Sequence, residues 1–199
     1  MKKMRVITLL KLLPIIVLMG CTITHIPMEF ASQNKPHLSG PYEPDPDNDG
    51  DTKGINYFPQ TRPATGNKIF IFDPTYHAWA AYDKEGVLVN TGKASGGSYF
   101  CPDVDRACKT IVGNHKIISK GGAGCISHRF PLKTHGGAPM PYCMHFSPKG
   151  YAIHGSTEIP DYNASHGCIR VTPAAAKWLN ENFVGIGTTV IVLPYLPNT

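Results

Sequence analysis

Short apolar stretches, separated by glycine, proline or charged residues, dominate the chain after residue 65. Most of them alternate apolar with polar side chains or are rich in β-branched and aromatic residues, a pattern typical of strands. The glycine-rich stretch 91–98 lacks the spacing of a phosphate-binding loop and predicts a turn. Strands are predicted at residues 68–72, 77–82, 87–89, 112–119, 142–146, 151–154 and 188–193.

One segment has a helical period instead. Ala175, Leu179 and Phe183 recur every four residues and predict a buried helical face. Thr172 is a suitable N-cap, and Pro173 suits the first helical position. The chain is therefore predicted to be predominantly β, a mixed sandwich-like or barrel-like arrangement of mostly antiparallel strands with one main helix.

Residues 1–20 have the pattern of an export signal. Four basic residues precede the apolar run Leu12–Met19, which is too short to span a bilayer. The run leads into Leu-Met-Gly-Cys, which resembles the lipobox of bacterial lipoproteins, so Cys21 is predicted to be lipidated. Thr22 rather than aspartate follows, which in lipoproteins of this kind implies the outer membrane. By this resemblance we expect a periplasmic protein anchored to the inner leaflet of the outer membrane.

Residues 21–65 are predicted to be a linker between this anchor and a domain at residues 66–195. Seven prolines and many small polar residues disfavour a packed core there. The acidic segment 45–51 resembles the first half of a calcium-binding loop. Asn56 stands where such a loop has a bidentate glutamate, so a solvated acidic turn is the preferred interpretation.

The charge excludes one class of partner. The formal net charge is +5, but four of the basic residues belong to the export signal. Residues 66–199 contain twelve basic and eight acidic residues, a balance of +4. This balance is too small for a typical nucleic-acid-binding surface and is compatible with an anionic polymer.

The stretch with the most chemical character runs through residues 153–156 and 165–171. It places His154, His166 and Cys168 within a short distance along the chain. Thiol catalysis needs a cysteine, a base that takes its proton and hydrogen-bond donors for the developing oxyanion. Either histidine is a candidate base.

Three neighbours of the cysteine are candidates for the oxyanion and substrate contacts. Gly167 lets the backbone approach a substrate carbonyl, and its amide and that of Cys168 are natural oxyanion donors. Arg170 suits a substrate that carries a carboxylate. Ser165, Gly167 and Arg170 are accordingly predicted to line the oxyanion and substrate site.

Two other interpretations compete with catalysis. Cysteine and histidine are both common in protein interiors, so either could be a core residue. A zinc ion could also be held by two histidines and a cysteine, but no second cysteine or carboxylate stands at ligand spacing. The combination of these residues therefore favours a thiol enzyme without a metal or an organic cofactor.

This stretch resembles the signature of the L,D-transpeptidase (YkuD-type) family: a His-Gly pair, a loop, then Ser-His-Gly-Cys, a hydrophobic residue and Arg. The resemblance covers residues 66–194. It also includes residues 110–117, 140–142 and 187–192, although Ile111 replaces a usual proline.

The resemblance implies a role for each residue of the signature. Cys168 would be the nucleophile and His154 its general base. The carbonyl of Gly155 would orient the His154 ring. His166 would support the site, and Arg170 would face the substrate.

Four cysteines remain when Cys21 and Cys168 are set aside. An even number in an exported chain suggests two disulfides, for which three pairings exist. Cys101–Cys108 and Cys125–Cys143 are favoured because each closes a local loop. A Cys₄ zinc site is the alternative, although the Cys-x₂-Cys spacing is missing.

By resemblance, the thiol would attack a peptidoglycan tetrapeptide stem at the bond between the diamino acid and D-alanine. D-Alanine would leave, and a second stem would accept the acyl group to form a 3-3 cross-link. An envelope protein or water is an alternative acceptor. A Cys-His peptidase and an inactive wall-binding lipoprotein are the other hypotheses.

Overall fold

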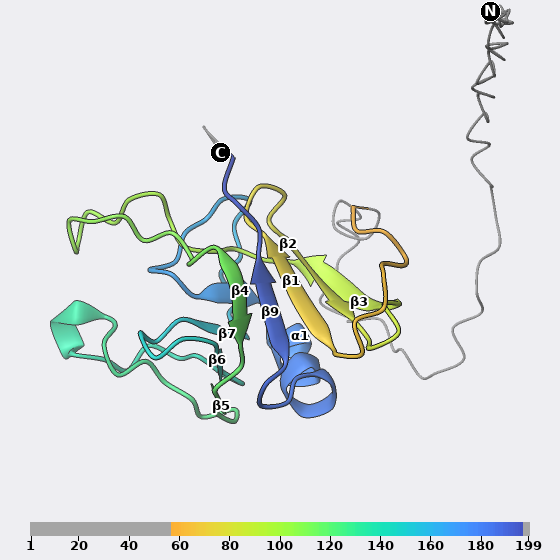
Figure 1. Ribbon diagram of the computed structural model, residues 1–199. Coiled ribbons are helices and arrows are strands. Elements are labelled where there is room, and N and C mark those ends of the chain that lie inside the picture. Colours follow the sequence, from red (N-terminus) through yellow and green to blue (C-terminus); the bar gives the residue numbers. More distant parts are fainter. Residues whose placement is uncertain (1–56, 197–199) are drawn as a thin grey trace, which may run out of the picture. The chain divides into compact units, whose positions relative to one another are not determined.

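The computed structural model describes residues 57–196, which form two mixed β-sheets and one main helix (Figure 1). The five-stranded sheet has the order β3-β2-β1-β9-β4, and the four-stranded sheet has the order β5-β6-β7-β8. Cys21 and the acidic segment 45–51 lie outside the described residues. The strands are β1 (Ile69–Asp73), β2 (Ala78–Tyr82), β3 (Leu88–Lys93), β4 (Gly113–Lys116), β5 (Ser119–Lys120), β6 (Met144–His145), β7 (Ala152–Gly155), β8 (Ile169–Val171) and β9 (Thr189–Val192).

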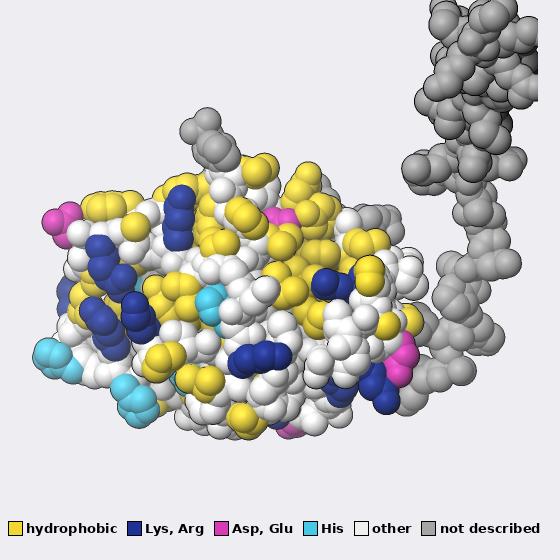
Figure 2. Space-filling model, in the orientation of Figure 1, with side chains coloured by type: hydrophobic (Ala, Val, Ile, Leu, Met, Phe, Trp, Pro, Cys, Tyr) yellow, Lys and Arg dark blue, Asp and Glu magenta, His cyan; other side chains and the backbone are white. Residues whose placement is uncertain are grey.

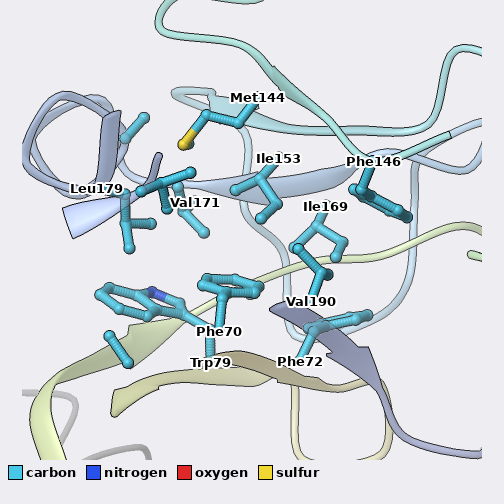
Figure 3. Packing of buried hydrophobic residues seen from close by; sticks show 14 of the residues in the cluster. Phe70, Phe72, Trp79, Met144, Phe146, Ile153, Ile169, Val171, Leu179 and Val190 are labelled. Carbon is cyan, nitrogen blue, oxygen red and sulfur yellow. The ribbon is translucent and has the colours of Figure 1, made fainter. Parts of the chain in front are cut away.

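The two sheets enclose the main core (Figure 3). Their facing side chains are large and apolar, which accounts for the strand pattern of the sequence. Strands β1, β2 and β9 contribute from one side, and strands β6, β7 and β8 from the other. The residues that meet there include Phe70, Phe72, Trp79, Val190, Met144, Ile153, Ile169 and Val171.

The main helix covers one end of this core. It starts as α1 (Pro173–Trp178) and continues as the π-helical turn η2 (Leu179–Phe183). The side chain of Thr172 accepts a hydrogen bond from the amide of Ala175, so the predicted N-cap is confirmed. Ala175, Leu179 and Phe183 are all buried, as the four-residue repeat predicts.

The outer face of the five-stranded sheet is also packed. Phe58 is buried against this face, and Tyr82 donates a hydrogen bond to the carbonyl of Pro59. Residues 57–65, which the sequence assigned to the linker, therefore contribute to the folded part of the chain. In Figure 2 hydrophobic side chains gather over this face, and lysine and arginine side chains gather towards one end of the molecule.

One strand prediction and one turn prediction need correction. The strand predicted at 112–119 divides into β4 and β5, which belong to different sheets. The division falls where the amide of Ile117 bonds to Thr188 and that of Ile118 bonds to His145. The predicted turn at 91–98 begins inside β3, because this strand continues to Lys93 along β2.

The short 3-10 helix η1 (Leu132–Thr134) lies within a long loop at residues 121–141. Strand β8 has only three residues and was not predicted. No helix among residues 57–196 is long and apolar enough to cross a membrane.

Leu179→Ala should destabilise the protein by about 2–5 kcal/mol, because it removes a fully buried side chain and leaves a cavity. Ile186→Ala is the matched control: its side chain is 67% exposed, and the change should cost no more than about 0.5 kcal/mol. Urea unfolding of both variants checks this. Equal shifts of the two midpoints would contradict the assignment of Leu179 to the core.

Candidate active site

The pairing of β7 with β8 creates the site. The two strands are parallel, with Ile153 opposite Ile169 and His154 opposite Arg170. Both isoleucines are fully buried in the core. Because side chains alternate along a strand, His154 and Arg170 project to the opposite face, and Cys168 follows the same alternation one residue before β8.

Cys168 is the one free cysteine among the described residues. Its half-buried side chain packs against a small apolar cluster that includes Met140 and Ala152. Its Sγ lies 3.7 Å from the carbonyl oxygen of Gly150. Burial raises the pKa of the thiol, although the backbone of Ala152 and the charge of Arg170 oppose this shift. The sulfur is therefore a protonated thiol at neutral pH.

His154 is oriented by its own strand. The Nδ1–H of the ring donates to the carbonyl oxygen of Gly155 at 2.9 Å, the contact that the resemblance implies. This bond leaves Nε2 as the nitrogen that can accept a proton. Burial lowers the pKa of His154 to about 4, and the charge of Arg170 contributes to the same shift. The ring is thus a neutral acceptor at neutral pH.

The loop before Cys168 is held by Ser165. Its hydroxyl accepts a hydrogen bond from the amide of Gly167 at 3.0 Å and donates one to the carbonyl of Cys168 at 2.5 Å. A Cβ at Gly167, where φ is +130°, would lie 2.6 Å from the ring of Tyr151, so only glycine fits. Two backbone amides were predicted to donate to the oxyanion. The Gly167 amide already donates to Ser165, so the amide of Cys168 is the remaining candidate oxyanion donor.

A cavity of about 990 Å³ opens over these residues. Cys168 and His154 line it, as do parts of the loop at 121–141. A second cavity, of about 560 Å³, shares two lining residues with the first, Arg170 and Glu158. These two side chains lie 3.7 Å apart, so Arg170 stands where the two cavities meet.

His166 also lines the larger cavity, but its contacts differ from those of His154. Its Nε2 lies 2.9 and 2.8 Å from the two carboxylate oxygens of Asp103. Its ring stacks on Phe130 with the centroids 4.2 Å apart. Asp103 and Phe130 were not predicted, because nothing in the sequence relates residues so far from the signature to His166.

Both favoured disulfides, Cys101–Cys108 and Cys125–Cys143, are formed in the structure. The first closes the loop that contains Asp103. The second joins the loop at 121–141 to the chain just before β6. Cys101, Asp103 and His166 come within 4.8 Å of one another, but the disulfide engages the sulfur of Cys101. Only two ligands would then remain for a metal ion.

The free energy of unfolding should fall between pH 6.5 and pH 4. His154 has a pKa of about 4 in the folded protein, against an ordinary value of 6.5, so the unfolded chain binds more protons in this window. The full effect of this group is roughly 3 kcal/mol. Burial also lowers the pKa of His77 and His145, which adds to the loss in the same direction.

Urea unfolding at several pH values checks this prediction. His154→Gln should flatten the pH dependence between pH 6.5 and pH 4. An unaltered slope in His154→Gln would show that this histidine is protonated in the folded protein as readily as in the unfolded chain.

The family model of the L,D-transpeptidase catalytic domain (YkuD) matches residues 66–192. The fold is similar to that of an L,D-transpeptidase from Xylanimonas cellulosilytica, with 29% identity and a TM-score of 0.55, over 68% of this chain and 64% of that chain. It is also similar to an L,D-transpeptidase from Stackebrandtia nassauensis, with 23% identity and a TM-score of 0.55, over 72% of this chain and 63% of that chain.

A third similar structure is L,D-transpeptidase 3 from Mycobacterium tuberculosis in complex with a faropenem-derived adduct. The identity is 23% and the TM-score 0.52, over 64% of this chain and 60% of that chain. The chain thus spans somewhat less than two thirds of these proteins. No curated protein matches it.

These comparisons confirm both the resemblance and the predominantly β fold that the sequence predicts. The family model covers more than half of the chain and includes both strands of the site. The chain therefore belongs to the family of L,D-transpeptidase (YkuD) catalytic domains.

Proposed function

We propose that this protein is a cysteine-dependent L,D-transpeptidase that acts on peptidoglycan stem peptides. The observation that carries the proposal is the pair of adjacent strands that presents Cys168 and His154 to one cavity. The free thiol and the available ring nitrogen have the chemistry of a nucleophile and its base. Membership of the L,D-transpeptidase family supports the choice of reaction.

The first half-reaction forms a thioester. Sγ of Cys168 attacks the carbonyl carbon between the diamino acid and D-alanine while His154 Nε2 takes the thiol proton. The amide of Cys168 donates to the developing oxyanion. When the carbon–nitrogen bond breaks, the protonated ring gives its proton to the departing amine of D-alanine.

The second half-reaction regenerates the thiol. An amine of another stem attacks the thioester carbonyl, and His154 takes the proton that this amine loses. The tetrahedral intermediate collapses and expels the sulfur, which regains a proton from His154. The product is a 3-3 cross-link. An envelope protein or water as the acceptor would use the same first half-reaction and give a different product.

The charge of the cavity supports an anionic peptide as substrate. Its lining contains four cationic side chains from separate segments and one carboxylate, that of Glu158. A stem peptide carries several carboxylates, which such a lining attracts and orients. The cationic residues are Arg106, Arg129, Lys149 and Arg170.

Cys168→Ala should abolish both tetrapeptide turnover and covalent labelling, because the nucleophile is gone. His154→Ala should keep the thiol but slow acylation by about 10²–10⁴-fold, the usual scale for a positioned base. Intact mass after mixing with imipenem measures acylation, and the masses of muropeptide products identify the acceptor. One solved L,D-transpeptidase with a similar fold is in complex with imipenem, which motivates this probe.

Control variants distinguish the proposed enzyme from the other hypotheses. Lys177→Ala, on α1 and outside both cavities, should react like the wild type. An unmodified wild-type protein with no tetrapeptide turnover would instead favour an inactive wall-binding lipoprotein. If His166→Ala slows acylation as much as expected for His154→Ala, while His154→Ala does not, the roles of the two histidines are exchanged.

The lipobox-like sequence supports a location for this activity. We propose that Cys21 carries a lipid that anchors the enzyme in the periplasm, on the outer membrane. Cys21→Ala should therefore leave the protein unprocessed or release it from the membrane fraction, whereas Cys168→Ala should stay there. Fractionation and immunoblotting measure this. A correctly processed Cys21→Ala protein that remains in the membrane fraction would exclude the lipid anchor.

A further inference from the structure

His166 is held from two sides by loops that lie outside both sheets. On one side its Nε2 is 2.9 and 2.8 Å from the carboxylate oxygens of Asp103. On the other its ring stacks on Phe130, which belongs to the long loop at 121–141. The side chain of His166 is 30% exposed and lines the cavity together with Phe130 and Cys168. The ring is therefore part of the wall beside the nucleophile.

The loop that carries Asp103 is fixed to the loop that carries His166. The Cys101–Cys108 disulfide closes it, and the amide of Cys101 donates to the carbonyl of Arg106 at 2.9 Å. Just before the disulfide, the amide of Ser98 donates to the carbonyl of Ser165 at 2.8 Å. The contact between Asp103 and His166 thus joins two segments whose backbones are already paired, so little conformational freedom is lost in forming it.

The contact also selects a form of the ring. A carboxylate accepts hydrogen bonds only, so Nε2 of His166 must carry the proton. The hydrogen bond to His166 lowers the pKa of Asp103, which keeps this carboxylate ionised. Arg106 of the same loop and Arg129 beside Phe130 are the other charged side chains that these loops place along the cavity. Asp103 itself contacts the cavity wall through His166.

We propose that Asp103 is a positioning residue of this enzyme: acting through His166, it fixes the tautomer and the orientation of the imidazole that forms the cavity wall beside Cys168. The role rests on the proposed function, because what the wall positions is the acyl donor. A ring that is free to rotate would leave the substrate carbonyl less well placed over the thiol, and misplacement slows the chemical step. The disulfide loop thereby becomes part of the active site.

The first test observes the ring directly and needs no substrate. Nitrogen-15 NMR of the histidine side chains should show His166 protonated at Nε2 in the wild type. Asp103→Ala should change the nitrogen shifts of His166 and leave those of His154 unchanged. Asp105→Asn is the control, because it removes the other carboxylate of the same disulfide loop. Asp105→Asn should leave the His166 signals as they are.

The second test measures acylation of Cys168 by imipenem in a double-mutant cycle. Asp103→Ala should slow acylation by about 5- to 50-fold. This loss lies between the effect of removing an exposed ion pair and the rate loss that a misplaced substrate causes. Asp103→Asn, which can still accept the hydrogen bond, should recover part of the rate, and Asp105→Asn should match the wild type. The variant with both Asp103→Ala and His166→Ala should be no slower than His166→Ala alone.

The outcomes distinguish this inference from the proposed function. Unchanged His166 signals in Asp103→Ala, or rate losses that multiply in the double variant, would overturn the positioning role while the enzyme remains active. A wild-type protein that imipenem does not modify and that turns over no tetrapeptide would overturn the function. In that case the NMR comparison alone still decides whether Asp103 sets the tautomer of His166.

Discussion

The parallel pairing of β7 with β8 is the contact on which the site depends. It buries Ile153 and Ile169 in the core and thereby turns His154 towards the side of Cys168. Parallel neighbours need a crossover of about a dozen residues, and residues 156–168 supply it without a helix. His154 and Cys168 are therefore separated in sequence by about as many residues as the crossover between the two strands needs.

Burial of this pair determines its resting state. It lowers the pKa of His154 and raises that of Cys168, and both shifts favour the neutral forms. The thiol and the imidazole therefore have little tendency to form an ion pair before substrate binds. In the proposed reaction the proton would therefore move as the carbon–sulfur bond forms. The charge of Arg170, which stands where the two cavities meet, acts on the pKa of both groups.

The walls of the site come from outside the sheets, and covalent and polar contacts hold them. The Cys125–Cys143 disulfide ties the long loop at 121–141 to the start of β6. The side chain of Asn180 donates to the carbonyls of Gly121 and Tyr142, which links the same loop to the helical turn η2. Together with the loop that Cys101 and Cys108 close, these contacts hold the edges of the larger cavity.

The sequence alone predicted most of the strands and the capped helix, favoured the two disulfides and singled out Cys168 and His154 as candidates, because hydrophobic period, capping and short motifs are local properties. Tertiary structure decided the rest. The division of 112–119 between two sheets and the contact of Asp103 with His166 both depend on segments that are distant in sequence. Such contacts leave no local pattern, because they depend on which backbones the fold brings side by side.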